Sequence, residues 1–321
     1  MMKQIFTAFL LIVALSSQSQ KLTPVEIKNF RTREDSLKRF ALKIVNGEDA
    51  AVRFRSDSNF TKILVRALVQ KNSFRYPFDS VVTVSKLYPP DSSFRIVTWQ
   101  VVKDESYCRQ RGFIQMNTKD GQLKLFPLRD VSEFTQNLND TVANAGGWIG
   151  AVYYRIVQKE YMNKKFYTLM GYDENNTRTT RKWIDILSFD EQQQPVFGLT
   201  NGFSFAKDSL PQTPMSRFLL EYKKDARSRI QYDEELDLII FDHLISESNE
   251  PKKKHTLIPD GDYEGFQWVN GQWLHIDKVF DFKLKDGEAP VPEPFSENKL
   301  QGEQPGKTTK PPVKKKQGGN Y

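Results

Sequence analysis

The dipeptide Asp242-His243 comes nearer to catalytic chemistry than any other pair in the sequence. It follows the apolar run 238–241, and polar side chains at the end of a strand can be presented to a substrate. A carboxylate can orient an imidazole that acts as general base for a serine nucleophile. Successive residues of a strand point to opposite faces, however, so one dyad is difficult to form. The favoured interpretation is a strand-terminating turn with a hydrogen-bonded histidine, and the alternative is a hydrolase with its site near Asp242 and His243.

Two polar stretches supply oxygen atoms of the kind that bind a hard cation. Asp173, Asn175 and Asn176 lie in the first, and Asp260 and Asp262 lie in the second. Calcium takes carboxylate and amide oxygens, but neither stretch matches the twelve-residue loop that closes with a bidentate glutamate. Turns favour the same residue types for backbone reasons. We expect turns here, with calcium as an alternative and no other cofactor, and we keep the five side chains as candidates for binding a ligand or partner.

Other catalytic motifs are absent from the sequence. The single cysteine, Cys108, excludes an intramolecular disulfide and is expected to be a small packed side chain rather than a nucleophile. The three histidines lack the spacing of a metal site such as HExxH. No GxSxG, GxGxxG, P-loop or CxxC motif occurs. The sequence therefore favours a protein without catalytic activity.

The segment 20–75 is predicted to form a helical hairpin. Thr23-Pro24-Val25-Glu26 combines an N-cap threonine, a proline at the first helical position and a glutamate that completes a capping box. Apolar residues then recur at helical spacing as far as Val45, and Asn46-Gly47 supplies a stop. A second amphipathic helix is expected from about Asp49 or Asp57.

The hairpin is basic, with thirteen Lys and Arg against six Asp and Glu between residues 21 and 75. Such a surface can attract nucleic acid or acidic lipid headgroups. The cations are interleaved with acids such as Glu34 and Asp35, so an ordinary solvated face is the favoured interpretation. Docking of the hairpin onto the more acidic remainder of the chain is the next alternative.

Residues 76–285 are predicted to form a mainly antiparallel β domain. Short runs rich in β-branched and aromatic residues alternate with turn signals such as Asp120-Gly121 and Asn270-Gly271. The expected strands are 80–84, 94–102, 112–116, 123–126, 150–157, 166–171, 183–189, 218–222, 229–232, 236–241, 265–269 and 273–275. The fold class is therefore α+β, and the pattern leaves a sandwich, a barrel and propeller-like blades open.

Both ends of the chain predict features outside the fold. Residues 1–19 have the lysine, the short apolar run and the small residues of a signal peptide cut before Gln20. Residues 286–321 form a Pro/Lys-rich stretch expected to be disordered, whose lysines offer peripheral contact with an anionic surface. We therefore expect an exported protein, periplasmic or extracellular, with no transmembrane segment in the mature chain and no nucleic-acid partner.

One resemblance supports the prediction of export. The segments GYDENN from Gly171, KWIDILSFD from Lys182, PVFG from Pro195, FDHL from Phe241 and PDGDYEGF from Pro259 resemble a family of secreted proteins of Bacteroidetes. The resemblance covers residues 147–278 and implies no activity, cofactor or catalytic residue. The leading functional hypothesis is an envelope or extracellular binding module, and the periplasmic or secreted hydrolase is the alternative.

Overall fold

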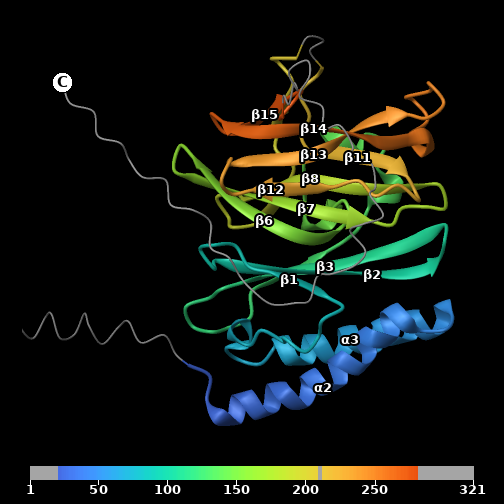
Figure 1. Ribbon diagram of the computed structural model, residues 1–321. Helices are drawn as coiled ribbons and strands as arrows, with labels where there is room; N and C mark the ends of the chain where they lie inside the picture. Colours follow the sequence, from blue (N-terminus) through green and yellow to red (C-terminus); the bar gives the residue numbers. More distant parts are fainter. Residues whose placement is uncertain (1–20, 209–211, 281–321) are drawn as a thin grey trace, which may run out of the picture. The chain divides into compact units, whose positions relative to one another are not determined.

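The computed structural model describes residues 21–208 and 212–280, which belong to one compact unit that ends at Phe280. The predicted signal peptide and the predicted tail lie outside the described residues. Two long helices come first and are followed by β-strands that pair mainly antiparallel (Figure 1). The predicted α+β fold, with a helical hairpin before a β domain, is confirmed.

The helices begin where the sequence predicts. In α2 (Pro24–Asn46) the Thr23 hydroxyl accepts from the Glu26 amide, and the Glu26 carboxylate accepts from the Thr23 amide at 2.7 Å. This reciprocal capping box satisfies two amides that a helix start leaves unpaired. In α3 (Ala50–Leu68) the Asp49 carboxylate accepts from the Val52 amide at 2.8 Å. The second helix therefore starts at the earlier of its two expected positions.

Three stacked sheets form the β domain. The first contains β1 (Ser85–Leu87), β2 (Phe94–Asp104), β3 (Tyr107–Met116) and β4 (Leu125–Leu128) in that order. The second contains β5 (Ala143–Asn144), β9 (Pro195–Phe197), β8 (Thr179–Phe189), β7 (Lys164–Asp173) and β6 (Val152–Tyr161), with β11 (Phe218–Lys223) also paired to β8. The third contains β10 (Phe203–Ser204), β15 (Gln272–Ile276), β14 (Leu257–Val269), β13 (Leu238–Ser246) and β12 (Ile230–Asp233).

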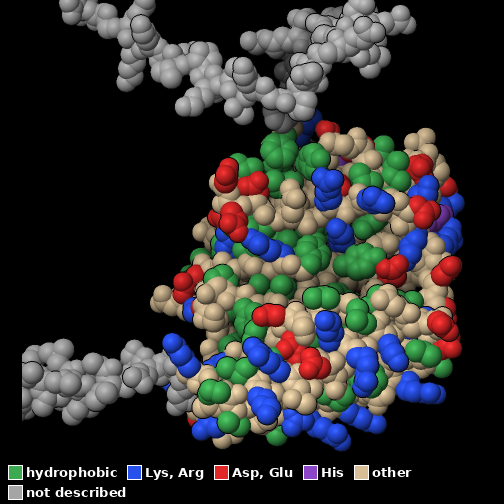
Figure 2. Space-filling view, turned by 60° about the horizontal axis from the view of Figure 1, so that its bottom comes forward, with side chains coloured by type: hydrophobic (Ala, Val, Ile, Leu, Met, Phe, Trp, Pro, Cys, Tyr) green, Lys and Arg blue, Asp and Glu red, His purple; other side chains and the backbone are tan. Residues whose placement is uncertain are grey.

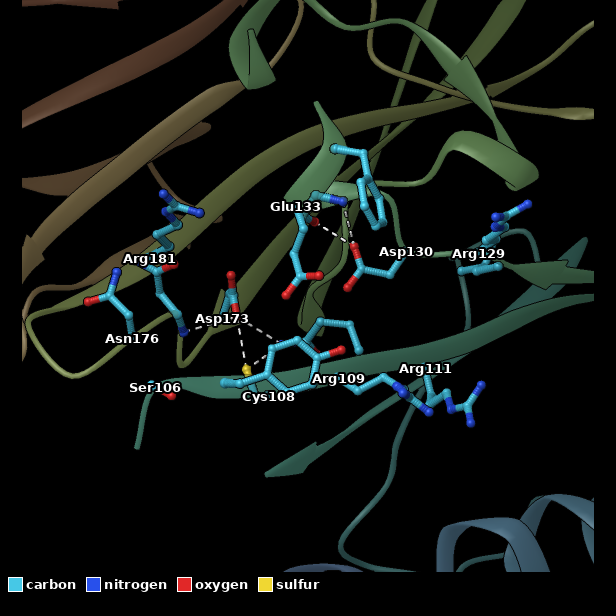
Figure 3. A pocket seen from close by; sticks show the side chains of 16 residues that line it. Ser106, Cys108, Arg109, Arg111, Arg129, Asp130, Glu133, Asp173, Asn176 and Arg181 are labelled. Atoms are coloured by element: carbon cyan, nitrogen blue, oxygen red, sulfur yellow. Dashed lines mark hydrogen bonds between the residues drawn. The ribbon is translucent and has the colours of Figure 1, made fainter. Parts of the chain in front are cut away.

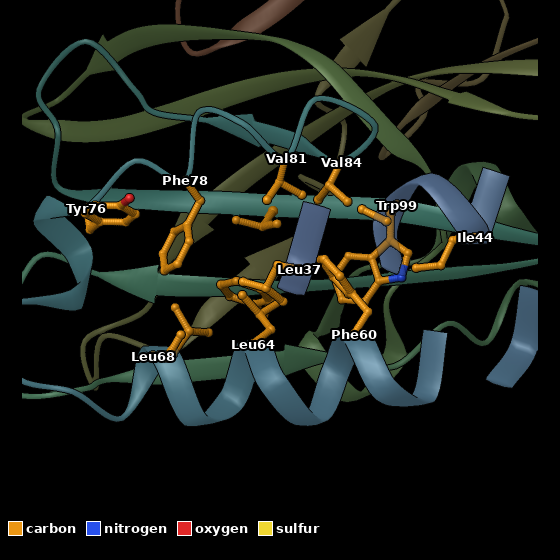
Figure 4. Close-up of a cluster of buried hydrophobic side chains, with 14 of the residues drawn as sticks. Leu37, Ile44, Phe60, Leu64, Leu68, Tyr76, Phe78, Val81, Val84 and Trp99 are labelled. Carbon is orange, nitrogen blue, oxygen red and sulfur yellow. The ribbon is translucent and has the colours of Figure 1, made fainter. Parts of the chain in front are cut away.

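Each apolar core lies between two successive layers. The helix core joins the hairpin to one face of the first sheet, and Figure 4 shows Leu37 and Phe60 of the helices turned toward Trp99 of β2. A second core lies between the first and second sheets, and a third between the second and third sheets. Alternation along β7 shows the division, because Leu169 contributes to the second core and Met170 to the third. The sheets are stacked face to face, so the arrangement resembles a sandwich with an extra layer.

Polar contacts fix the hairpin on the first sheet. Asp57 of α3 is 1 % exposed and accepts from the Trp99 indole at 2.8 Å and from Arg111 at 3.0 Å. Glu34 of α2 is also buried and accepts from the Tyr76 hydroxyl. The hairpin does dock on the rest of the chain, but the charges are the reverse of those expected. Its buried acids Glu34 and Asp57 meet the β domain, and among its basic side chains Arg53 donates to the carbonyl groups of Val102 and Lys103 in β2.

Three expectations about strands are wrong. Asp242 and His243 do not lie in a strand-terminating turn, because β13 continues past them to Ser246. Residues 80–84 form turns rather than a strand, and Lys86 donates to the carbonyl groups of Val81 and Val84. Those carbonyls are therefore satisfied without a neighbouring strand. The stretch around Asp260 and Asp262 is not a separate loop, because it belongs to β14 at a register shift opposite β13.

Candidate functional site

A cavity of about 570 Å³ opens where the first and second sheets meet. Residues 106–111 of the β2–β3 turn and β3 form one wall, and residues 128–134 after β4 form another. The third comes from the end of β7 and the start of β8, between residues 173 and 181. The volume of the cavity lies in the range of sites that bind small ligands.

The floor of the cavity is a buried group around Asp173. Its carboxylate accepts from the Gln110 side chain at 2.9 Å, from the Asn175 amide at 3.1 Å and from the Cys108 thiol at 3.4 Å. Burial raises the pKa of Asp173 above its usual value, although these donors and Arg181 oppose the shift. Asp173 is therefore a positioned acceptor that is partly shielded from water.

One buried polar atom of the floor has no partner. The Gln110 side chain is 4 % exposed, and its Nε2 is held by Asp173, yet its Oε1 meets no donor among the described residues. A buried carbonyl without a donor costs about 1–3 kcal/mol. Gln110 lines the cavity, but Oε1 itself is buried, so a donor from a bound molecule removes this cost only if the Gln110 amide turns toward the cavity.

The upper walls carry charged groups that face the same space. Figure 3 shows Asp130 and Glu133 on one side of the cavity and Cys108 and Asp173 on the other. Asp130 is fixed by the backbone amides of Ser132 and Gly150, both at 3.0 Å. This segment is therefore a shaped wall rather than a free loop.

The arginines around the cavity differ in their pairing. Arg181 binds Glu221 at 3.0 Å, and Arg111 binds Asp57. Arg109 lies over the Phe54 ring, and the exposed Arg129 side chain forms no hydrogen bond or ion pair with other described residues. Arg109 and Arg129 are therefore cations without a carboxylate partner at the rim of the cavity.

The cavity contains no activated nucleophile. Burial, followed by the neighbouring Asp173 charge, raises the pKa of Cys108 to about 12, so the thiol stays protonated near neutral pH. None of the histidines lies among the residues that line the cavity. Ser132 donates to Asp130 and accepts from the Gly150 amide. These groups suit the binding of a polar molecule.

A second polar cluster lies in the third sheet, and we call it the imidazole chain. It consists of Asp208, His275, Glu264, His243 and Asp260. The His275 nitrogens lie 2.9 Å from Asp208 and 2.8 Å from Glu264, and the other Glu264 oxygen lies 3.7 Å from His243. His243 is in turn 2.8 Å from Asp260. Burial lowers the pKa of His275, but both carboxylates outweigh burial and raise the pKa above its usual value.

The residues predicted from the sequence are divided among different places. Asp173, Asn175 and Asn176 all line the cavity, whereas Asp260 belongs to the imidazole chain. Asp242 does not bind His243, because its carboxylate accepts from the Arg229 amide at 2.7 Å. The structure therefore separates the two members of the proposed Asp242-His243 dyad.

The oxygens of the two calcium candidates serve the backbone. Asn176 Oδ1 accepts from the Arg178 and Thr179 amides, and Asp260 Oδ1 accepts from the Asp262 amide. Within residues 21–208 and 212–280 no group of His, Cys, Asp or Glu is arranged to hold a metal ion. A turn accounts for the asparagine side chains, and the register shift of β14 opposite β13 accounts for Asp260.

Sequence reasoning missed most of the cavity and the imidazole chain. Cys108 and Asp173 are 65 residues apart, so no local spacing connects them. The contact between Glu264 and His275 could have been predicted from the sequence, because the turn at Asn270-Gly271 sets the register that pairs Phe266 with His275. Glu264 is two residues from Phe266 and therefore lies on the same face of the sheet.

Comparisons with protein-family models, curated proteins and solved structures found no match. The resemblance to secreted proteins of Bacteroidetes therefore stays a prediction. None of the helices described between residues 21 and 280 combines the length and apolar character needed to cross a bilayer.

Proposed function

We propose that this protein is an exported binding module without catalytic activity, and that its ligand enters the cavity above Asp173. The observation that carries the proposal is the unpaired Gln110 Oε1 beside the positioned Asp173 carboxylate. Asp173 already accepts three hydrogen bonds, and a donor from a ligand would satisfy Gln110 Oε1 once the Gln110 amide turns toward the cavity. The rim arginines Arg109 and Arg129 add positive charge at the other end of the cavity.

This arrangement favours a polar molecule with hydrogen-bond donors at one end and an anionic group at the other. Guanidinium groups bind carboxylates and phosphates through charge-assisted hydrogen bonds, and buried acceptors select amines or hydroxyls. Amino acids, short acidic peptides and acidic sugars share this chemistry. A periplasmic or extracellular location would supply all three.

The test is calorimetric titration with amino acids, acidic dipeptides and uronic-acid oligosaccharides. We expect a member of this panel to bind the wild type. The Arg129→Gln variant should bind the same compound at least tenfold more weakly. The matched control is Arg227→Gln, which removes an exposed arginine away from the cavity. Equal affinity in both variants, or no binding by any panel member, would contradict the proposed ligand site.

A hydrolase near His243 is the second candidate. One observation favours it, because the 2.8 Å contact with Asp260 is the kind that orients an imidazole as a general base. Turnover of ester or peptide substrates that disappears in His243→Ala would support the hydrolase. Binding to the cavity without turnover would support the module.

A further inference from the structure

The outer side of the helical hairpin carries a large excess of positive charge. Between residues 21 and 71 the exposed basic side chains are Lys21, Lys28, Arg31, Lys38, Arg39, Lys43, Arg55, Lys62, Arg66 and Lys71. The exposed acidic ones are Asp35, Glu48 and Asp49. We call this surface the outer hairpin face.

The imbalance arises because the fold withdraws acids and leaves the cations outside. Glu34 and Asp57 are 7 % and 1 % exposed and face the first sheet. Glu26 is occupied at the helix start, where it accepts from Thr23 and from the Asn72 side chain. Three of the six interleaved acids, Glu26, Glu34 and Asp57, are therefore occupied by other contacts, and Asp35, Glu48 and Asp49 stay exposed.

The cations of the outer hairpin face are not neutralised by neighbours. None of the ten forms an ion pair with a carboxylate in the described part of the chain. Figure 2 shows Lys and Arg side chains gathered over the lower part of the molecule, toward which the helices are turned. Like charges placed this close together favour an anionic partner.

Apolar side chains lie among these cations. Four aliphatic side chains of the two helices, and Val69 directly after α3, have exposed fractions from 39 % to 69 %. The four in the helices are Val25, Leu42, Val45 and Val65. The hairpin aromatics Phe30 and Phe60 are buried in the helix core. Exposed aliphatic groups without exposed aromatic rings suit an acyl-chain boundary better than nucleic-acid bases, which stack on aromatics.

We propose that the outer hairpin face binds the anionic surface of a lipid bilayer, with α2 and α3 lying along the membrane plane. The 23 residues of α2 extend about 34 Å, so the cations are spread over many headgroups. Lysine and arginine contact phosphates, and the aliphatic side chains enter the headgroup boundary. This surface is separate from the cavity and does not depend on the proposed ligand.

The test is co-sedimentation of the predicted mature chain, residues 20–321, with vesicles of equal parts phosphatidylglycerol and phosphatidylcholine. Each basic residue near such a surface contributes about fivefold to the partition coefficient. The variant Lys28→Gln/Lys38→Gln/Lys62→Gln/Arg66→Gln should therefore bind at least 100-fold more weakly. Wild-type protein should not bind pure phosphatidylcholine and should be released by 1 M salt.

Two controls with the same loss of charge locate the binding surface. The first replaces exposed lysines of the β domain in Lys119→Gln/Lys207→Gln/Lys252→Gln/Lys254→Gln. The second changes the tail in Lys310→Gln/Lys314→Gln/Lys315→Gln/Lys316→Gln. Both should keep vesicle binding within a few fold of wild type. Loss of binding in either control that equals the loss in the hairpin variant would overturn the proposal.

A third variant separates a bilayer from other polyanions. Val45→Ser/Val65→Ser/Val69→Ser keeps every charge and changes only exposed positions. It should weaken vesicle binding several-fold and leave adsorption to single-stranded DNA unchanged. Unchanged vesicle binding, together with DNA binding as tight as vesicle binding, would show a general polyanion surface and reject the lipid assignment.

Discussion

The cavity above Asp173 and the imidazole chain around His275 use similar chemical groups, but they differ in how far those groups are satisfied. In the imidazole chain both His275 nitrogens meet carboxylates. In the cavity wall, the buried Gln110 Oε1 has no partner among the described residues, and the exposed Arg129 side chain has no hydrogen bond or ion pair there. Saturated buried polar clusters stabilise and specify a fold, whereas unsatisfied ones beside a cavity are suited to ligands. Shifted pKa values occur in both regions and alone do not distinguish them.

The largest expected effect is the loss of the central imidazole. His275→Leu leaves Asp208 and Glu264 without their shared partner, and removal of one member of a buried charged group costs about 3–5 kcal/mol. Urea unfolding at pH 7 should show this decrease in the free energy of unfolding. Arg129→Gln at the cavity should change it by no more than about 0.5 kcal/mol. Similar losses in both variants would remove the distinction between the regions.

The next effect concerns the thiol of the cavity floor. The pKa of Cys108 is raised to about 12, so its thiolate fraction at pH 8 is far below that of a free cysteine. Alkylation by iodoacetamide should be at least about 100-fold slower in the folded protein than in urea. Asp173→Asn should accelerate it by removing a neighbouring negative charge. A native rate close to the unfolded rate would show that the floor is open to solvent.

The imidazole chain predicts a smaller effect of pH. Since the folded pKa of His275 lies above the unfolded value of about 6.5, its stabilisation is present below that value and is lost as pH rises through the folded pKa. The melting temperature should fall by a few degrees between pH 6 and pH 9. His275→Leu should flatten this part of the profile. A wild-type profile that rises with pH over this range would contradict the prediction.

The smallest expected effect is that of calcium. The candidate oxygens of Asn176 and Asp260 already accept from backbone amides. Melting curves in millimolar calcium and in chelator should therefore coincide. A rise of several degrees in the melting temperature with calcium would support the cation-site hypothesis. The polar end of β7 or the imidazole chain would then also be a region that binds a ligand.

Local signals predicted the elements better than the site. The Thr23 and Glu26 capping box defines the start of α2, and Asn270-Gly271 defines the last hairpin, because each signal acts within a few residues. The strand prediction for residues 80–84 is wrong because Val81 and Val84 pack against the helices and Lys86 donates to the carbonyl group of Val81. Its burial comes from a tertiary contact that periodicity does not reveal.

The cavity could not be assembled from local patterns. The sequence drew attention to Asp173 and its asparagines, and the structure places them on one wall. The opposing walls come from β3 and the segment after β4, whose approach depends on stacking of the first and second sheets. The polar connection after Asp173 is also shorter than expected, because Thr179 and Thr180 are buried in β8.

The order of the layers follows the order of the chain, and this has a consequence for folding. The buried residues of the helix core end at Phe113, those of the second core end at Phe197, and those of the third extend to Trp273. A chain that emerges from its N-terminus can therefore complete one core before the last residues of the next have appeared. The parallel pairing of Phe203 in β10 with Trp273 in β15 must wait until nearly the whole described chain is available. Folding along the growing chain would then proceed from the helices outward and finish with that pairing.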